Sequence, residues 1–291
     1  MAVRDPFMKR VAAIHDISGV GRSALKAIIP VMSTMGIEVN PLPTAVLSSD
    51  TNGTAPYSFV DLTDTMAEYI RCWKAIDMSF DCIYSGFLGS PAQVCILEDF
   101  IRDFSRTDTF VVVDPVLGDD GAIYRSVAPE MVREMRCLAA RAHMITPNFT
   151  EAALLLGEPC REQIDTPTLK IWLRRLAELG PEVVVITSVP DGEAHTAVAA
   201  LDTATGKAWK LSSRYIPAAY PGTGDIFTSV VTGSLMQGDS LPVALDRAVQ
   251  FVGQCILVSS GYGYPEREGV LLEKELPLLR VPVRVRGYEE L

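Results

Sequence analysis

Short apolar runs alternate with longer amphipathic segments along most of this 291-residue chain. The short runs are typical of buried strands, whereas the longer segments place apolar residues three and four positions apart, as one face of a helix requires. Strands are therefore expected at residues 9–14, 39–47, 82–84, 109–113, 143–145 and 183–187, with a hairpin of 196–201 and 207–211. Helices are expected at residues 23–35, 62–76, 91–104, 129–139, 150–156, 166–179, 224–237 and 241–259.

Strands that alternate with helices predict an α/β fold in which helices cover both faces of a mostly parallel sheet. No linker, repeat or change of composition interrupts the alternation, so residues 1–291 are expected to form a single domain. The stretch 261–291 is rich in proline and charge and is expected to be mostly irregular. In such sheets ligands bind beyond the carboxyl ends of the strands, so the polar side chains at those ends are the candidates for function.

Composition narrows the classes of function. The chain is 48% hydrophobic and 21% charged, as globular proteins are, and its net charge of −10 argues against a nucleic-acid partner. No apolar run approaches the roughly 20 residues of a membrane helix, and no long apolar region follows the amino terminus, so neither a membrane span nor a signal peptide is expected. Six scattered cysteines without a Cys-x-x-Cys pair fit a reduced cytoplasmic protein, and three histidines far apart argue against a His-based zinc site.

The segment Pro221-Gly222-Thr223-Gly224-Asp225 carries the most chemical information, and it comes directly before an apolar helical stretch. Its two glycines let backbone N–H groups turn toward one point, and the helix start adds its positive dipole end, so the segment is suited to hold a phosphate. An aspartate at a helix start is ordinarily a cap, but a carboxylate beside a bound phosphate repels it. Asp225 is better explained as a base that takes a proton from a hydroxyl group attacking that phosphate.

Polar clusters fall at the ends of four predicted strands. They are His15-Asp16-Ile17-Ser18, Asp114-Pro115, Thr146-Pro147-Asn148 and Thr187-Ser188. Asp114 and Asp119 place two carboxylates on one loop, and Glu151 follows the third cluster, so these loops are a candidate site for Mg²⁺, which binds through carboxylates, waters and substrate phosphates. Both loops have a structural alternative, because Asp, Pro and Gly form turns and because Asn148 or Thr150 can cap a helix that has Glu151 in its first turn.

Two familiar nucleotide motifs are missing from the sequence. Asp16-Ile17-Ser18-Gly19-Val20-Gly21 has a Gly-x-Gly sequence, but the third glycine position is Ala24 and the acid about 20 residues further on is Glu38. The chain also lacks a Walker sequence. A nucleotide would therefore bind by another route.

Together these motifs resemble the ribokinase-like superfamily, in its vitamin-kinase branch. The resemblance covers the anion hole and catalytic base of the superfamily, the pyridoxal kinase loop and two further shared motifs, in order from about residue 10 to 260. The residues concerned are Gly222-Thr223-Gly224-Asp225, Asp114-Pro115-Val116-Leu117-Gly118-Asp119 with Gly121 and Tyr124, Thr146-Pro147-Asn148 with Glu151, and Ile186-Thr187-Ser188. The resemblance implies a three-layer α/β/α sandwich with a mostly parallel central sheet.

Within that branch, the motif from Asp16 to Gly21 resembles the hydroxymethylpyrimidine kinase pattern, whereas residues 42–49 and 61–64 resemble pyridoxamine kinases. The chain is therefore similar to pyridoxal/pyridoxamine kinases of the hydroxymethylpyrimidine-kinase-like type. This resemblance implies ATP-dependent phosphorylation of the 5′-hydroxymethyl group of pyridoxal, pyridoxamine or pyridoxine. Hydroxymethylpyrimidine kinase activity in thiamin synthesis stays open as an alternative, and a non-catalytic ligand-binding relative stays open as another.

The resemblance also implies roles for individual residues. Asp225 would be the base that deprotonates the acceptor hydroxyl. The residues implied to contact ATP are Asn148, Thr187 and Ser188 together with Gly222, Thr223 and Gly224, of which the last three stabilise the transferring phosphoryl group. The residues implied to hold metal are Asp119 and Glu151 for Mg²⁺, and Asp114, Thr146 and Glu151 for a monovalent cation, K⁺ or Na⁺. The residues implied to bind the acceptor ring are Asp16, Ser18, Thr51 and Phe87.

The segment before the glycines departs from part of the family. Some members carry a cysteine there that is able to react with the pyridoxal aldehyde, whereas this chain has Ala218-Ala219-Tyr220-Pro221. That chemistry is therefore absent. The resemblance further implies a homodimer.

Overall fold

The computed structural model describes residues 8–49, 56–282 and 285–291. These residues form a ten-stranded sheet in the order β12-β11-β10-β9-β8-β5-β4-β1-β2-β3. The central strands from β2 to β9 run parallel, whereas β3 at one edge and β10, β11 and β12 at the other pair antiparallel. The mostly parallel α/β fold predicted from the sequence is confirmed.

The elements follow the alternation expected from the apolar pattern. The sheet strands are β1 (Arg10–Ser18), β2 (Glu38–Leu47), β3 (Phe59–Asp61), β4 (Cys82–Ser85), β5 (Phe110–Val113), β8 (Met144–Ile145), β9 (Val183–Pro190), β10 (His195–Asp202), β11 (Lys207–Arg214) and β12 (Glu289–Glu290). The helices of eight residues or more are α1 (Leu25–Thr34), α2 (Thr63–Ala75), α3 (Pro91–Phe104), α4 (Met131–Ala139), α5 (Phe149–Leu156), α6 (Thr166–Ala177), α7 (Thr223–Met236) and α8 (Leu241–Gly261).

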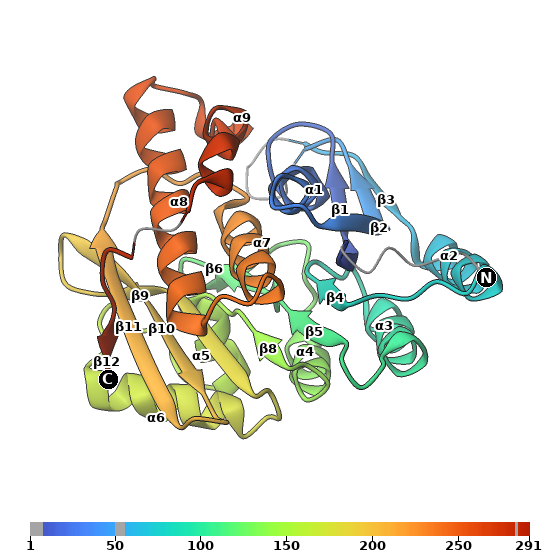
Figure 1. Cartoon of the computed structure of the whole chain (residues 1–291), viewed down its shortest axis with the longest axis horizontal. Coiled ribbons are helices and arrows are strands. Elements are labelled where there is room, and N and C mark those ends of the chain that lie inside the picture. Colours follow the sequence, from blue (N-terminus) through green and yellow to red (C-terminus); the bar gives the residue numbers. More distant parts are fainter. Residues whose placement is uncertain (1–7, 50–55, 283–284) are drawn as a thin grey trace.

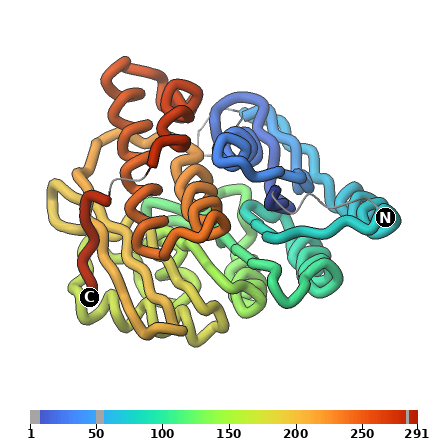
Figure 2. Tube along the Cα trace, viewed as in Figure 1, coloured from blue at the N-terminus to red at the C-terminus, as the bar shows by residue number. Residues whose placement is uncertain are grey.

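Helices cover both faces of the sheet, which gives the expected three layers (Figure 1). Helices α1, α7 and α8 pack on one face, and α2 to α6 pack on the other. Strand β1 shows why a central strand must be apolar along its whole length. Its residues Val11 and Ala13 belong to the core under α1, α7 and α8, whereas Ala12 and Ile14 belong to the core under α2 to α6. The tube view shows α1 beside α7, although the two helices are far apart in the sequence (Figure 2).

Strand β1 is longer than the apolar run predicted. It continues through His15 and Asp16 to Ser18, because Ile17 and Ser18 still pair with β2. The pairing register shifts between His15 and Ile17, so Asp16 lies at an irregularity of the strand. Such irregularities turn a side chain away from its regular direction and are frequent beside active sites.

The loop that carries Asp114 and Asp119 contains a short hairpin that the sequence reading missed. Strands β6 (Gly118–Asp119) and β7 (Ala122–Ile123) pair antiparallel around Asp120 and Gly121, whose φ angles are 48° and 79°. Two positive φ angles define a type I′ turn, for which Asp-Gly is a favoured sequence. The signal for this hairpin was therefore present in the sequence.

The expectation of a mostly irregular tail needs correction. Residues after α8 form the short helices η1 (Glu266–Glu268), α9 (Leu272–Glu275) and η2 (Leu276–Arg280), followed by β12. Val270, Leu272 and Leu279 are buried in the core that α1, α7 and α8 share. Burial of these apolar side chains explains why a segment rich in proline and charge is ordered against the rest of the protein.

Helix α8 also differs from expectation. By length and composition alone it is apolar enough to cross a membrane, contrary to the prediction that no run would reach this length. Within the protein, 44% of its most apolar window is buried. The helix packs against α7 and β11, as the core helices of α/β domains do.

Candidate active site

The amino end of helix α7 forms the centre of the candidate site. Gly222 precedes the helix with a φ of 87°, and a Cβ atom there would lie 2.0 Å from the carbonyl oxygen of Arg22. Close packing therefore requires glycine at this position. A Cβ atom at Gly224 would meet no heavy atom within 4 Å. Packing within the protein does not explain glycine at position 224, whereas the approach of a ligand to the helix end would.

Asp225 lies in the first turn of α7 with both carboxylate oxygens engaged. Its Oδ2 accepts a hydrogen bond of 2.7 Å from the backbone N–H of Ala24, and its Oδ1 lies 2.9 Å from Nε2 of His15. Both partners come from β1 and the turn that follows it, so the packing of this turn against α7 sets the orientation of the carboxylate.

His15 connects Asp225 to Asp16. Its imidazole is only 3% exposed, and its Nδ1 lies 2.9 Å from Asp16 Oδ1. The hydroxyl of Ser18 donates to the other oxygen of Asp16 at 3.1 Å. Burial alone would lower the pKa of His15, but the charges of Asp225 and Asp16 outweigh it and raise the pKa to about 10. The two neighbouring carboxylates therefore favour the protonated imidazole.

A second buried cluster joins α7 to the ends of β5 and β8. The Thr228 hydroxyl lies 3.3 Å from Asp114 Oδ2 and 3.0 Å from the Thr146 hydroxyl. Asp114 is only 6% exposed, and burial together with repulsion from Asp225 raises its pKa to about 7. This carboxylate therefore lies in a region that already carries negative charge.

Glu151 and Asn148 form a capping box at the start of α5. The backbone N–H of Glu151 donates to Asn148 Oδ1 at 2.9 Å, and the backbone N–H of Asn148 donates to Glu151 Oε2 at 2.8 Å. The other Glu151 oxygen accepts from the Leu117 amide, while the Asn148 side-chain amide donates to the Gly118 carbonyl. The predicted helix-capping role is confirmed, and it ties this helix to the loop of Asp114 and Asp119.

The carboxylates are suited to hold cations. Burial and the nearby charge of Asp114 raise the pKa of Glu151 well above its ordinary value, and burial raises the pKa of Asp119. The oxygens of Asp114, Thr146, Glu151 and Asp119 are the hard ligands that Mg²⁺ and alkali cations prefer. Among the residues that the structure describes, no group of three or more His, Cys, Asp or Glu side chains is arranged to hold a metal ion by itself. Waters and substrate phosphates would have to complete the ligand set.

Thr187 and Ser188 lie where β9 departs from regular geometry. Thr187 bridges to Asn148 as the parallel pairing of β8 and β9 continues. Ser188 has a φ of 56°, and the pairing of β9 with β10 shifts register at this point. The bulge leaves Ser188 exposed at the carboxyl edge of the sheet, beside Asn148 and Thr187.

The predicted acceptor side is only partly described. Phe87 follows β4, is buried and meets Phe59 of β3 edge-on, with ring centroids 6.5 Å apart. The Thr44 hydroxyl of β2 donates to the Phe87 carbonyl at 2.9 Å. Thr51 lies outside the described residues.

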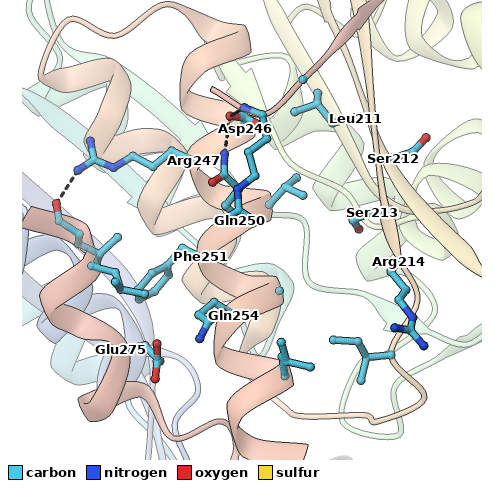
Figure 3. Close-up of a pocket in the computed structure, with 18 of the residues that line it drawn as sticks. Leu211, Ser212, Ser213, Arg214, Asp246, Arg247, Gln250, Phe251, Gln254 and Glu275 are labelled. Atoms are coloured by element: carbon cyan, nitrogen blue, oxygen red, sulfur yellow. Dashed lines mark hydrogen bonds between the residues drawn. The ribbon is translucent and has the colours of Figure 1, made fainter. Parts of the chain in front are cut away.

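A groove of about 1060 Å³ lies between β11 and α8 (Figure 3). Leu211 to Arg214 line it from the strand, and Asp246, Gln250 and Gln254 face them from the helix (Figure 3). Its wall continues through residues 215–217, which lead directly to Gly222. The chain therefore passes from the wall of this groove into the segment that precedes α7.

The sequence matches the phosphomethylpyrimidine kinase family over residues 21–267. The chain belongs to this family. Several relatives of this chain have names that refer to vitamin B6. The pyridoxine/pyridoxal/pyridoxamine kinase of Bordetella bronchiseptica is 30% identical over 249 residues, which cover 82% of this chain and 85% of that protein.

Several solved structures are closely similar to this fold. A Bacteroides thetaiotaomicron protein described as a phosphomethylpyrimidine kinase, solved in a crystal form with pyridoxal, is 52% identical with a TM-score of 0.94. The match covers 97% of this chain and 99% of that one. Pyridoxal kinase from Lactobacillus plantarum is 32% identical with a TM-score of 0.84, covering 94% of this chain and 96% of its own. The ribokinase-like pyridoxal kinase type inferred from the motifs is confirmed.

Sequence reasoning missed two residues that the structure brings into the candidate site. His15 was seen in a polar cluster but was given no role, because nothing local indicates that it meets a residue 210 positions away, at Asp225. Thr228 follows Asp225 by three positions on α7, so the helical spacing could have placed both side chains on one face.

The raised pKa of Asp114 predicts how stability depends on pH. A carboxyl group whose folded-state pKa lies above its ordinary value of 3.8 stabilises the fold at low pH, and this contribution is lost as pH rises from 3.8 to about 7. We expect Asp114→Asn to stabilise the metal-free protein at pH 8 by on the order of 2 kcal/mol and to have little effect at pH 4. Denaturant unfolding of both proteins across this range measures the difference. A difference that does not change with pH would contradict the assignment.

Proposed function

We propose that this chain catalyses the ATP-dependent phosphorylation of the 5′-hydroxymethyl group of vitamin B6, forming the 5′-phosphate. The observation that carries the proposal is Asp225, whose carboxylate is fixed at two atoms beside the open space at Gly224. A base and an anion-binding helix end at one point are what transfer of a phosphoryl group to a hydroxyl requires. Relatives named pyridoxal kinases support the choice of acceptor.

In this proposal the acceptor lies between β1 and the segment after β4. Asp16, Ser18 and Phe87 contact the ring, with Thr51 assigned from the resemblance. The 5′-hydroxyl then points toward Asp225, which takes its proton as the oxygen attacks the γ-phosphorus of ATP. The bond from that phosphorus to the β,γ-bridging oxygen breaks, and ADP leaves. The N–H groups of Gly222, Thr223 and Gly224 stabilise the charge on the transferring phosphoryl oxygens.

ATP enters from the other side of α7 in this proposal. The base and ribose occupy the part of the groove between β11 and α8 that lies beside residues 215–217, because the chain continues from there to Gly222. Ser188 and Thr187 meet the phosphates at the edge of the sheet. Asn148 joins them through its position beside Thr187, although its side chain also caps α5.

Cations neutralise the phosphates in a protein whose net charge is −10. We assign Mg²⁺ to Asp119 and Glu151, largely through water, because both Glu151 oxygens already accept backbone hydrogen bonds. A monovalent cation, K⁺ or Na⁺, is assigned to Asp114, Thr146 and Glu151. When bound, these ions offset the charge of the phosphate oxygens.

Three wider predictions accompany the proposal. The single ten-stranded sheet supports one kinase domain for residues 1–291. Free thiols at all six cysteines fit the predicted reduced cytoplasmic location. The family resemblance is the basis for proposing a homodimer.

Hydroxymethylpyrimidine is the second candidate acceptor, since the family carries that chemistry in its name and the Asp16 to Gly21 motif resembles it. ATP consumption should be measured with pyridoxal, pyridoxamine, pyridoxine and hydroxymethylpyrimidine at equal concentration. We expect a higher kcat/KM for at least one B6 vitamer than for the pyrimidine. The opposite order would assign the chain to thiamin synthesis, and no turnover with any acceptor would support a non-catalytic relative.

Asp225→Asn tests the base. The amide has nearly the shape of the carboxylate but does not accept the hydroxyl proton, so kcat should fall by about 10²–10⁴-fold. The affinity for Mg-ATP, measured by calorimetry, should stay close to that of the wild type. Full activity of the variant would show that Asp225 is not the base.

Gly224→Ala tests the open space at the helix end. The added methyl group meets no protein atom and alanine favours a helix by about 1 kcal/mol, so the melting temperature should not fall. In contrast, kcat should fall by about tenfold to a hundredfold, because the methyl group occupies space needed by the phosphoryl group. Gly261→Ala at the end of α8 is the matched control, since a Cβ atom there also meets nothing within 4 Å. Equal activity of the two variants would argue against phosphate at Gly224.

A further inference from the structure

We propose that His15 is a positioning residue, whose imidazole bridges Asp16 and Asp225 and so fixes the base relative to the acceptor. The inference rests on the proposed function. It extends that function because it joins the acceptor side and the phosphoryl-transfer side through one side chain. Neither the helix-end motif nor the acceptor motif contains this connection by itself.

The contacts form an unbroken series. Ser18 donates to Asp16 Oδ2, and Asp16 Oδ1 lies 2.9 Å from His15 Nδ1. His15 Nε2 lies 2.9 Å from Asp225 Oδ1, which is an ion-pair distance without the alignment of a hydrogen bond. The series ends at the Ala24 amide, which donates to Asp225 Oδ2 at 2.7 Å. With each oxygen held from a different direction, the Asp225 carboxylate cannot rotate about its terminal bond without breaking one of these contacts.

The imidazole itself is held in place by close packing. It is 3% exposed, and a Cβ atom on Gly86 would lie 2.0 Å from its Cδ2 atom. Gly86 in turn donates its backbone N–H to the Ile14 carbonyl at 2.9 Å. The segment after β4 therefore leaves room for the ring and for no larger neighbour, so the position of His15 is set by backbone atoms.

Charge explains why a histidine suits this position. The charges of Asp16 of β1, Asp225 of α7 and Asp114 after β5 act on the imidazole, and Tyr84 of β4 lies near Asp114 and Asp225. Three of these are carboxyl groups, and Tyr84 is a buried phenol whose pKa is raised well above its ordinary value by burial and by the nearby carboxylates. A cation among them offsets the repulsion between Asp225 and Asp114, which a neutral amide or an apolar residue would leave in place.

A pair of substitutions separates positioning from support of the fold. His15→Gln places an amide near the former Nε2 position and keeps a donor toward Asp225, whereas His15→Asn reaches only the Nδ1 position and loses it. With the acceptor that the wild type uses best, we expect kcat of His15→Asn to fall by about 10²-fold, since misplaced groups cost that much. His15→Gln should retain about tenfold more kcat than His15→Asn, the value of one hydrogen bond to a charged group. KM for ATP should stay within about threefold of the wild-type value, because the substitution removes no contact that binds ATP equally in the ground state and the transition state.

Two further variants complete the test. His195→Gln removes an exposed histidine of β10 and should leave kcat unchanged. Gly86→Ala keeps His15 but displaces its ring, and should reproduce the loss seen in His15→Asn. Equal kcat for His15→Gln and His15→Asn, or full activity of both, would overturn the proposal. If His15→Asn does not fold, the kcat of Gly86→Ala tests the proposal in its place, and a wild-type kcat in Gly86→Ala would overturn the proposal.

A spectroscopic measurement tests the bridge without using activity. With ¹⁵N-labelled histidine the chain gives signals from only three side chains, and His15 is assigned by its loss in His15→Gln. We expect both ring nitrogens of His15 to carry protons at pH 8, because each faces a carboxylate. A ring with one protonated nitrogen, its Nδ1 accepting from the Asp16 amide 2.9 Å away, would overturn the bridge. A wild type that phosphorylates none of the acceptors would contradict the proposed function and leave this result standing.

Discussion

The structure depends on bringing several buried carboxylates to one edge of a parallel sheet. Asp16 lies near the end of β1, Asp114 directly follows β5, Glu151 lies in the helix after β8, and Asp225 lies at the start of α7. Such a concentration of like charge in a poorly solvated place opposes folding, as the raised pKa values of Asp114 and Glu151 show. Backbone N–H groups, the end of a helix and one buried imidazole offset it. The same arrangement that is unfavourable in the empty protein favours the cations and the nucleophile that phosphoryl transfer uses.

The turn between β1 and α1 fixes the position of the amino end of α7 and of Asp225. Its backbone packs against Gly222 so closely that a methyl group does not fit, and its Ala24 amide binds Asp225. The side chain of Arg22 extends to the other side, where it pairs with Glu273 and donates to the Glu268 carbonyl. The carboxyl-terminal segment therefore supports the turn from outside, which gives the ordered tail a role in holding the helix end in place.

The net negative charge of the protein opposes the binding of an anionic substrate, which only groups close to the site can overcome. With a net charge of −10 the protein as a whole repels ATP. Attraction must come from short-range features, namely the amides at the start of α7 and cations held by the carboxylates. Binding of the nucleotide should then depend on cations more strongly than in a kinase that uses lysine and arginine side chains.

The sequence by itself determined the fold class, the alternation of strands and helices, and the chemical character of each strand end, because apolar periodicity and turn residues act over a few neighbouring positions. It also indicated the helix end at residues 222–225 and the capping of α5. The tertiary structure decided which of these groups meet. It placed α7 over the face of β1 that carries His15, so that His15 meets Asp225, ordered the tail by burying Val270 and Leu279, and left Gly224 facing open space. These outcomes follow from packing between segments far apart in the sequence, such as Arg22 and Glu273, which are 251 residues apart, and no local pattern encodes such a contact.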